Sequence, residues 1–213
     1  MEREITEIKV QKKNPDRVSI YLDGEYEFGL SRIVAAWLQV GQRLSDQAIE
    51  SLLKQDSDEV AYSKALHFLQ LKPRTEKEIR LKLTEKEFTQ DQIEAVIRRL
   101  HEADLIADER YAEEWVENRK ALHPRSRRLV AMELRQKGIT ENVIEEALKD
   151  SLPDDETALQ AAMQYSRKIQ SDDRLKFQKR MNAFLSRRGF SYETIVPVVE
   201  SIWKMKESEK PQS

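Results

Sequence analysis

The chain of 213 residues has no cysteine, only five glycines and six prolines, and no run of 18 apolar residues. The lack of cysteine excludes disulfides, thiolate metal sites, iron–sulfur clusters and a cysteine nucleophile. The lack of a long apolar run excludes a membrane-spanning helix. Few chain breakers beside 36% charged and 39% hydrophobic residues indicate a mainly helical protein. The N-terminus is too charged for a signal peptide, so we expect a cytoplasmic protein with no membrane partner.

Enzyme signatures are missing as well. The sequence contains no G-x-x-x-x-G-K-[ST] loop, and its glycines never form G-x-G-x-x-G. The three histidines, His67, His101 and His123, stand apart without metal-ligand spacing. The carboxylate pairs that begin at Asp154 and Asp172 precede predicted helices, where capping explains them. We therefore expect no catalytic residue, no metal and no cofactor.

The formal net charge of −2 hides an uneven distribution. Residues 1–59 carry eight basic and twelve acidic side chains, whereas residues 119–150 carry eight and five. The window 167–190 is strongly basic, and Asp172 and Asp173 are its only acidic residues. Such a window suits an anionic partner, although a solvated face is the commoner meaning of a charge run.

The first thirty residues read as three short strands. Apolar and polar residues alternate over 18–22 and 25–29, and Asp23-Gly24 between them suits a type I′ hairpin turn. Residues 5–10 supply the other strand. A meander of this size is unstable alone, so we expect it to pack on two helices, the second from about Asp46.

The rest of the chain repeats one unit three times at an offset of 51 residues, without gaps. In each unit a helix ends at a basic residue, and a glycine or glutamate, a large apolar residue and a hydroxyl that suits an N-cap follow. The matching positions are Lys86, Lys137 and Arg188, then Glu87, Gly138 and Gly189, then Phe88, Ile139 and Phe190, then Thr89, Thr140 and Ser191.

Further helices are predicted to start near Asp58, Asp108 and Asp154, which gives three helices per unit. The predicted fold is mainly α, with three tandem three-helix repeats and a small N-terminal antiparallel β-meander. The expected domains are the meander with short helices at 1–57, the repeats at 58–107, 108–153 and 154–207, and a disordered tail at 208–213.

Basic residues form a stripe on the middle helix of the third unit. Lys176, Arg180 and Arg187 are 4 and 11 residues apart, which places them on one face of a helix, with Lys179 beside it. Apolar residues fall on the opposite side. A basic stripe backed by an apolar one is typical of a phosphate-facing surface, although a solvated face with weak ion pairs explains it equally well.

The second unit adds a basic cluster around the loop at residues 123–124. Arg125 and Arg127 flank Ser126, the expected N-cap of a helix whose free amides also attract anions. The basic residues at the helix ends, such as Lys137 and Arg188, are explained by the helix dipole. The candidate nucleic-acid or filament contacts are Arg119, Lys120, Arg125, Arg127, Arg128, Lys176, Lys179, Arg180 and Arg187.

Three segments resemble signatures of the RecX family, bacterial regulators of the RecA recombinase: KPRTEKEIRLKL at 72–83, LIADERYAEEWVENR at 105–119 and ELRQKGI at 133–139. The resemblance spans about residues 60–205. The sequence departs from the family at Ala107, where Asp is usual, and at Glu87, where Gly is frequent; Asp108 remains available as the N-cap. Tyr111 and Trp115 occupy a family motif, at positions where we expect core packing.

The resemblance implies a regulator without chemistry. RecX-like proteins are three-helix repeat proteins that lie along the groove of the RecA–single-stranded DNA filament, inhibit its ATPase and strand exchange, and can promote its disassembly. On this basis we expect a monomer that binds the RecA filament, with single-stranded DNA contacted mainly inside it, in DNA repair, homologous recombination and the SOS response. The low net charge argues against strong binding to free DNA.

Two other function classes stay open. Three-helix units can place a recognition helix in the major groove of duplex DNA, usually as a dimer. No unit shows an exposed set of Arg, Asn and Gln at a helix start that would read bases. The chain could also be a protein-binding scaffold whose basic stripes are irrelevant, in which case its binding would be indifferent to salt and to DNA.

Overall fold

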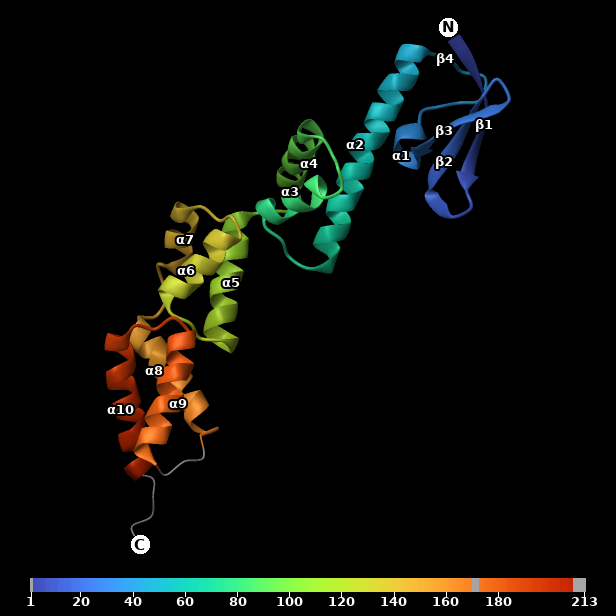
Figure 1. The fold of residues 1–213 in the computed structure, drawn as a ribbon. Helices are drawn as coiled ribbons and strands as arrows, with labels where there is room; N and C mark the ends of the chain where they lie inside the picture. The colour runs from blue at the N-terminus through green and yellow to red at the C-terminus, as the bar shows by residue number, and fades with distance from the viewer. Residues whose placement is uncertain (1, 170–172, 209–213) are drawn as a thin grey trace. The chain divides into compact units, whose positions relative to one another are not determined.

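The computed structural model describes residues 2–169 and 173–208, which form two compact units. The first unit contains the chain up to Arg74 together with Glu78–Ile106, and the second contains Thr75–Lys77 and the chain from Ala107 onward. Three helical bundles and an N-terminal antiparallel sheet make up the structure (Figure 1). The predicted fold class is therefore confirmed.

The N-terminal sheet has four strands rather than the three predicted. It contains β1 (Glu2–Gln11), β2 (Asn14–Leu22), β3 (Glu25–Ser31) and β4 (Arg43–Ser45), in the order β3-β2-β1-β4 with antiparallel pairing. Asp23 and Gly24 join β2 to β3 with φ angles of 50° and 90°, as a type I′ turn requires. The three-residue β4 is too short to show an alternating pattern, which is why the sequence did not reveal it.

The helices that follow differ from the prediction. The short helix α1 spans only Arg32–Ala35, and α2 runs without a break from Asp46 to Leu71. The helix start expected near Asp58 is therefore wrong. Ile49 at the beginning of α2 is buried against the sheet, and Ala61 and Ala65 further along are buried in the first three-helix bundle. One helix thus supplies both cores of the first unit.

Asp56 explains why the acidic stretch in α2 is not a helix start. The residue is 7% exposed, and its carboxylate accepts hydrogen bonds from the backbone amide of Ser31 at 2.6 Å and from Arg17 Nη2 at 2.7 Å. Arg17 Nη2 also donates to the carbonyl of Gly29 at 2.9 Å. The carboxylate is thus a tertiary partner that fastens the sheet to α2 rather than a cap.

Replacing Asp56 with alanine should lower the free energy of unfolding of the first unit by about 2–3 kcal/mol. The substitution leaves the partly buried Arg17 without its carboxylate and the Ser31 amide without an acceptor. Urea unfolding followed by circular dichroism measures the loss. Asp16→Ala removes an equal charge from an exposed position in β2 and should change the midpoint little; equal effects of the two substitutions would contradict this role.

Three bundles follow the sheet, and each has its own core. The first combines the end of α2 with α3 (Glu76–Thr84) and α4 (Gln90–Glu102). The second contains α5 (Asp108–Leu122), α6 (Arg127–Gln136) and α7 (Glu141–Leu148). The third contains α8 (Asp154–Ser166), α9 (Arg174–Arg187) and α10 (Tyr192–Ser208).

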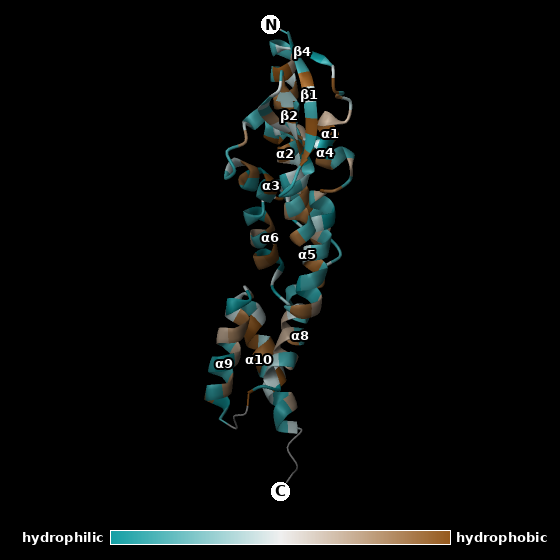
Figure 2. Ribbon diagram, turned by 90° about the vertical axis from the view of Figure 1, so that its right-hand side faces the viewer, coloured by the Kyte–Doolittle hydropathy of each residue, from teal (hydrophilic) through white to brown (hydrophobic). Residues whose placement is uncertain are grey.

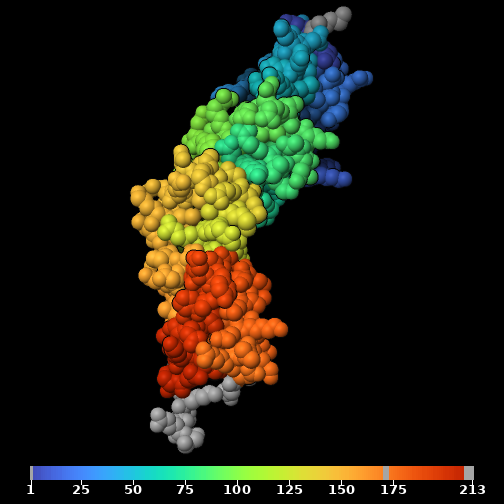
Figure 3. Space-filling model, turned by 60° about the vertical axis from the view of Figure 1, so that its left-hand side comes forward, coloured from blue at the N-terminus to red at the C-terminus, as the bar shows by residue number. Residues whose placement is uncertain are grey.

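Apolar residues gather inside each bundle and hydrophilic ones lie outside, as the hydropathy colouring shows (Figure 2). In the third bundle, Phe177, Met181 and Leu185 of α9 are fully buried, and Trp203 of α10 packs against Phe177 with ring centroids 5.1 Å apart. The bundle forms one closely packed body in the space-filling view, where it runs from orange to red (Figure 3). This core fixes which face of α9 reaches solvent.

The three hydroxyl residues predicted as N-caps by the repeat lie directly before their helices. Thr89 forms a full capping box with Gln92, and Ser191 accepts from the amide of Thr194 at 3.2 Å. Thr140 has the extended backbone of an N-cap, but its side chain makes no capping hydrogen bond. The repeat register therefore located three helix starts correctly.

The second unit contains the same junction twice, at positions related by the repeat. Thr75 Oγ1 donates to the carbonyl of Lys137 at 2.7 Å, and the amide of Ser126 donates to the carbonyl of Arg188 at 3.0 Å. Thr75 and Ser126 are fully buried. Thr75 lies just before α3 and contacts the residue after α6, and Ser126 lies just before α6 and contacts the residue after α9. The repeat therefore extends to the contacts between neighbouring repeats.

A carboxylate at the start of the next repeat completes each junction. Asp108 Oδ1 accepts from the amide of Glu76 at 3.2 Å, and Asp154 Oδ1 accepts from the amide of Arg127 at 2.9 Å. The expectation that Asp108 caps its own helix is wrong, because Ala107 is the N-cap of α5 and supplies no side-chain cap. The Asp108 carboxylate instead satisfies the first amide of another helix, which the sequence alone could not reveal.

Two remaining expectations concern the end of the chain and the membrane. The disordered tail expected at 208–213 lies outside the described residues except for Ser208, which is the last residue of α10. None of the described helices combines the length and apolar character that a membrane crossing needs.

Candidate nucleic-acid interface

Helix α9 presents the predicted basic stripe to solvent. Asp173 caps the helix by accepting from the amides of Leu175 at 2.9 Å and Lys176 at 3.2 Å. These bonds hold the pKa of the Asp173 carboxyl below its usual value, with the Lys176 amide as the largest cause. The four predicted residues of the stripe are all exposed: Lys176, Lys179, Arg180 and Arg187.

Most cations of this stripe have no partner. Among the described residues, Lys179, Arg180 and Arg187 make no ion pair or side-chain hydrogen bond, and Lys176 makes one exposed pair with Asp173 at 3.5 Å. Helix α9 itself contains no acidic residue. Ala183, which lies between Arg180 and Arg187 along the helix, is small and exposed. A surface of this kind can neutralise phosphates without first breaking internal ion pairs.

The predicted cluster in the second bundle is organised around one carboxylate. Glu133, whose side chain is 11% exposed, accepts from Arg119 Nε at 2.8 Å and from Trp115 Nε1 at 2.9 Å. Arg125 Nη1 forms an ion pair with the other oxygen of Glu133. Burial holds the pKa of Arg119 and Arg125 below the usual arginine value, and for Arg125 the nearby positive charge of Arg119 adds to this. Both arginines remain protonated at neutral pH.

Arg188 joins this cluster, although its sequence position suggested only a helix-end role. Its Nη1 donates to the carbonyl of Pro124 at 2.8 Å, and its guanidinium lies 4.4 Å from the ring centroid of Phe184. Burial and the charge of Arg125 lower its pKa. Lys137 lies 5.8 Å from the Trp115 ring. The recurring basic position at the helix ends was the signal that could have placed Arg188 beside Arg125.

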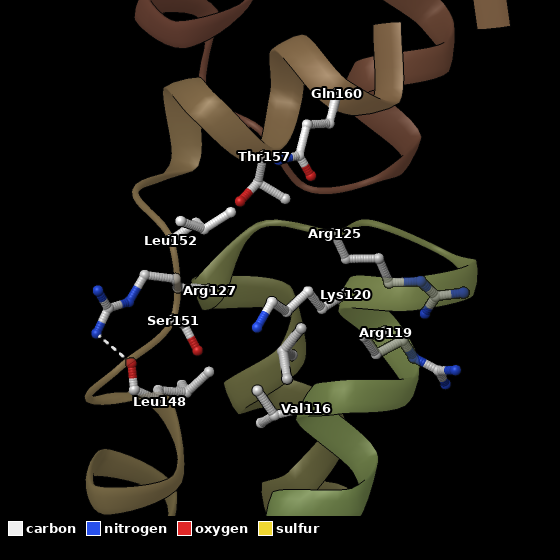
Figure 4. A pocket seen from close by; sticks show the side chains of 11 residues that line it. Val116, Arg119, Lys120, Arg125, Arg127, Leu148, Ser151, Leu152, Thr157 and Gln160 are labelled. Atoms are coloured by element: carbon white, nitrogen blue, oxygen red, sulfur yellow. Dashed lines mark hydrogen bonds between the residues drawn. The ribbon is translucent and has the colours of Figure 1, made fainter. Parts of the chain in front are cut away.

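Arg127 and Lys120 are separated from this cluster (Figure 4). The guanidinium groups of Arg119 and Arg125 point to the same side, whereas Arg127 turns away and donates from Nη2 to the carbonyl of Leu148 at 2.8 Å. Lys120 is exposed and pairs with Glu117 of its own helix at 3.2 Å. The structure therefore gathers Arg119, Lys120, Arg125 and Arg127 around one pocket but directs their charged groups to different sides. Arg128 is exposed and has no partner among the described residues.

A small pocket lies where α5, α6, the end of α7 and the first turns of α8 meet. Val116, Val130 and Leu148 belong to its apolar part. Its positive charge comes from the four basic residues of the lining: Arg119, Lys120, Arg125 and Arg127. Figure 4 shows the Lys120 amine directed toward Ser151, at the opposite wall. Arg127 donates one hydrogen bond to the Leu148 carbonyl and so links α6 to the end of α7. The pocket therefore has a structural role within the second unit.

Tyr111 and Trp115 pack against the core of the second bundle, as the sequence predicts, but neither is fully buried. Both are half-buried, with ring centroids 5.7 Å apart and an interplanar angle of 19°. The Arg119 guanidinium lies 4.2 Å from the Trp115 ring centroid, and a cation in this position is attracted by the ring. The two rings pack against the second core on one side and hold Arg119 on the other. The motif therefore positions a cation as well as filling space.

No group of three or more His, Asp or Glu residues in the described ranges could hold a metal ion. The predicted carboxylate pairs have structural partners instead. Asp154 serves the inter-repeat junction and Asp173 caps α9, while Asp172 lies outside the described residues.

Four family models match successive parts of the chain. They are described as the regulatory protein RecX N-terminal domain, at residues 3–45, and the first, second and third three-helix domains of RecX, at 61–100, 108–148 and 153–199. The last three correspond to the three helical bundles.

Curated relatives and solved structures agree with these matches. A regulatory protein RecX of Clostridium acetobutylicum is 32% identical, with 95% of this chain and 97% of the relative covered, and one of Bacillus subtilis is 30% identical over 93% and 76%. A crystal structure of regulatory protein RecX matches at a TM-score of 0.70 with 29% identity, covering 90% of this chain and 96% of that one. RecX from Lactobacillus salivarius matches at 0.58 with 28% identity, covering 69% and 97%. On this evidence, the chain belongs to the RecX family of regulatory proteins.

Proposed function

We propose that this protein regulates the RecA recombinase by binding the RecA–single-stranded DNA filament and inhibiting its ATPase and strand exchange. It does so as a cytoplasmic monomer without chemistry of its own, in homologous recombination, DNA repair and the SOS response. The family is named for a regulatory role, which supports the regulatory part. The observation that carries the nucleic-acid part is the basic face of α9, whose cations Lys179, Arg180 and Arg187 have no partner among the described residues.

The charge pattern favours phosphate over bases as the group that α9 contacts. Each phosphate that a cation neutralises on a single strand releases about 0.7 counterion, so such binding weakens steeply as salt increases. Arginine and lysine on one exposed face need no particular base order. A partner with a regular phosphate spacing, such as DNA held in a filament, fits this face.

The nine predicted contact residues then divide into two groups. Arg128, Lys176, Lys179, Arg180 and Arg187 are exposed and can meet phosphate directly. The other four have partners within the chain. Arg119 and Arg125 pair with Glu133, Arg127 donates to the Leu148 carbonyl, and Lys120 pairs with Glu117. In the proposed complex Arg119, Arg125 and Arg127 keep these internal hydrogen bonds and ion pairs, and their remaining N–H groups donate to phosphate.

The experiment that tests this function is a titration of the DNA-dependent ATPase of RecA with the protein. We expect ATP hydrolysis to fall as the protein is added. Inhibition far below one chain per RecA monomer indicates end capping or disassembly, and inhibition near equal amounts indicates coating of the groove. Added free single-stranded DNA should not restore the activity, since restoration would show that the protein only sequesters DNA. Unchanged hydrolysis would contradict the proposal.

A further inference from the structure

The first unit exposes three large apolar side chains that neither its cores nor the basic interface uses. Trp37 is 88% exposed, Val40 is 64% exposed and Ile33 is 63% exposed. The neighbouring residues point the other way, since Ala35 is buried and Leu38 packs against the N-terminal core. The segment is therefore anchored on one side and presents an apolar face on the other.

Backbone hydrogen bonds hold this segment in place. The amide of Gly41 donates to the carbonyl of Ile5 at 2.7 Å, and the amide of Ile5 donates to the carbonyl of Gln42 at 2.8 Å. The amide of Leu38 donates to the carbonyl of Ala35 at 3.0 Å. A tryptophan on a backbone fixed to strand β1 loses little conformational entropy when a partner covers it, which is the property of a preorganised anchor.

The charges around the patch suit an acidic protein surface. Residues 32–43 contain no Asp or Glu, and their two cations, Arg32 and Arg43, are exposed and form no ion pair among the described residues. The side chains of Ile33 and Val40 have neither a charge nor a hydrogen-bond donor for a phosphate. Tryptophan and arginine are enriched among the residues that dominate the affinity of protein–protein interfaces.

We propose that Trp37, flanked by Ile33 and Val40, inserts into an apolar pocket of a protein partner whose rim carries carboxylates that meet Arg32 and Arg43. The inference rests on the proposed function, in which this partner is a RecA subunit of the filament. The chain then meets the filament in two ways, through α9 on phosphate and through the N-terminal patch on protein.

The test is the affinity of Trp37→Ala for filaments of RecA on poly(dT), measured by the fluorescence anisotropy of the labelled chain at several salt concentrations. We expect the Kd to rise about tenfold or more, with the salt dependence unchanged, because an apolar anchor is lost and no charge. Arg32→Glu combined with Arg43→Glu should also weaken binding. The matched control is Tyr192→Ala, which removes another aromatic side chain, 76% exposed, from the second unit.

Each alternative partner of Trp37 predicts a different result. Because Trp37 makes little internal contact, its alanine variant should keep the circular dichroism and melting of the unchanged chain. Equal affinities of this variant and the unchanged chain would overturn the inference and leave the proposed function intact. A loss seen equally on poly(dT) without RecA would assign Trp37 to base stacking, and a dimer broken by the substitution would assign it to a second copy. An unchanged chain that does not bind the filament would overturn the proposed function and this inference with it.

Discussion

Replacing Arg180 and Arg187 together with glutamate should weaken binding to the RecA–DNA filament on the order of a hundredfold or more at low salt, and remove inhibition of the ATPase. Both side chains are exposed on one face of α9 and have no partner among the described residues, so the loss comes from the interface and not from the fold. The substitution removes two attractions to phosphate and adds two repulsions. Anisotropy titrations of the filament at several salt concentrations measure both the affinity and the salt slope.

The matched control is Lys12→Glu combined with Lys13→Glu. These residues are exposed in the turn between β1 and β2 and have no partner among the described residues, so the change in net charge is the same. The control should change binding much less, because a change in net charge outside the contact surface acts weakly once salt screens it. The assignment of α9 fails if the two variants bind equally, or if the α9 variant loses affinity while its salt slope stays the same.

The sequence predicted the α9 face for a simple physical reason. A helix repeats every 3.6 residues, so the spacing of Lys176, Arg180 and Arg187 places them on one face whatever the rest of the chain does. Apolar residues at helical spacing on the opposite side predict that the basic face is exposed, and the burial of Phe177 and Leu185 agrees. Whether a cation is free depends on acidic side chains brought in by other helices, and spacing along one helix carries no such information.

In the second bundle, the partners of the basic residues come from other segments of the chain. Arg119, Arg125 and Glu133 lie on separate segments, and only the packing of α5 against α6 brings them together. The sequence therefore showed a basic cluster but not the carboxylate at its centre. Arg188 was assigned to a helix end for the same reason, although its guanidinium donates to the carbonyl of Pro124.

The N-terminal region was less well predicted than the repeats. Three copies of one pattern allow each helix to be checked against its equivalents, but the sheet and α2 occur once. The acidic stretch around Asp56 looked like a helix start because carboxylates are common there. In the structure the carboxylate accepts from Arg17 and from the Ser31 amide, which are 39 and 25 positions away in the sequence.

The glycines of the repeat have a second role that explains the departure at Glu87. Gly138 and Gly189 have φ angles of 91° and 84°, as the closing turn of a helix requires. A Cβ on Gly189 would lie 2.6 Å from Ser126 Oγ and 2.7 Å from Leu129 Cβ. Glu87 has a φ of 63° but is exposed, so a side chain fits there. Glycine is thus required where a closing turn presses against another helix start.

Gly189→Ala should therefore lower the free energy of unfolding of the second unit by about 2–5 kcal/mol, which combines left-handed strain of about 1–2 kcal/mol with overpacking of about 1–3 kcal/mol. The overlap falls on Ser126, which is buried at the junction and also caps α6. Urea unfolding in a Trp37→Phe background measures the loss, because the remaining tryptophans, Trp115 and Trp203, both lie in the second unit.

The control that separates strain from overlap is Gly24→Ala, followed by circular dichroism. Gly24 has a φ of 90°, close to that of Gly189, but a Cβ there would meet nothing within 4 Å. It should cost only the backbone strain, so the Gly189 variant should be clearly the less stable of the two relative to its parent. Equal losses would show that the second bundle tolerates the extra atom and that the junction at Ser126 is loosely packed. A clear difference would show that the junction at Ser126 is closely packed, with no room for one more carbon atom.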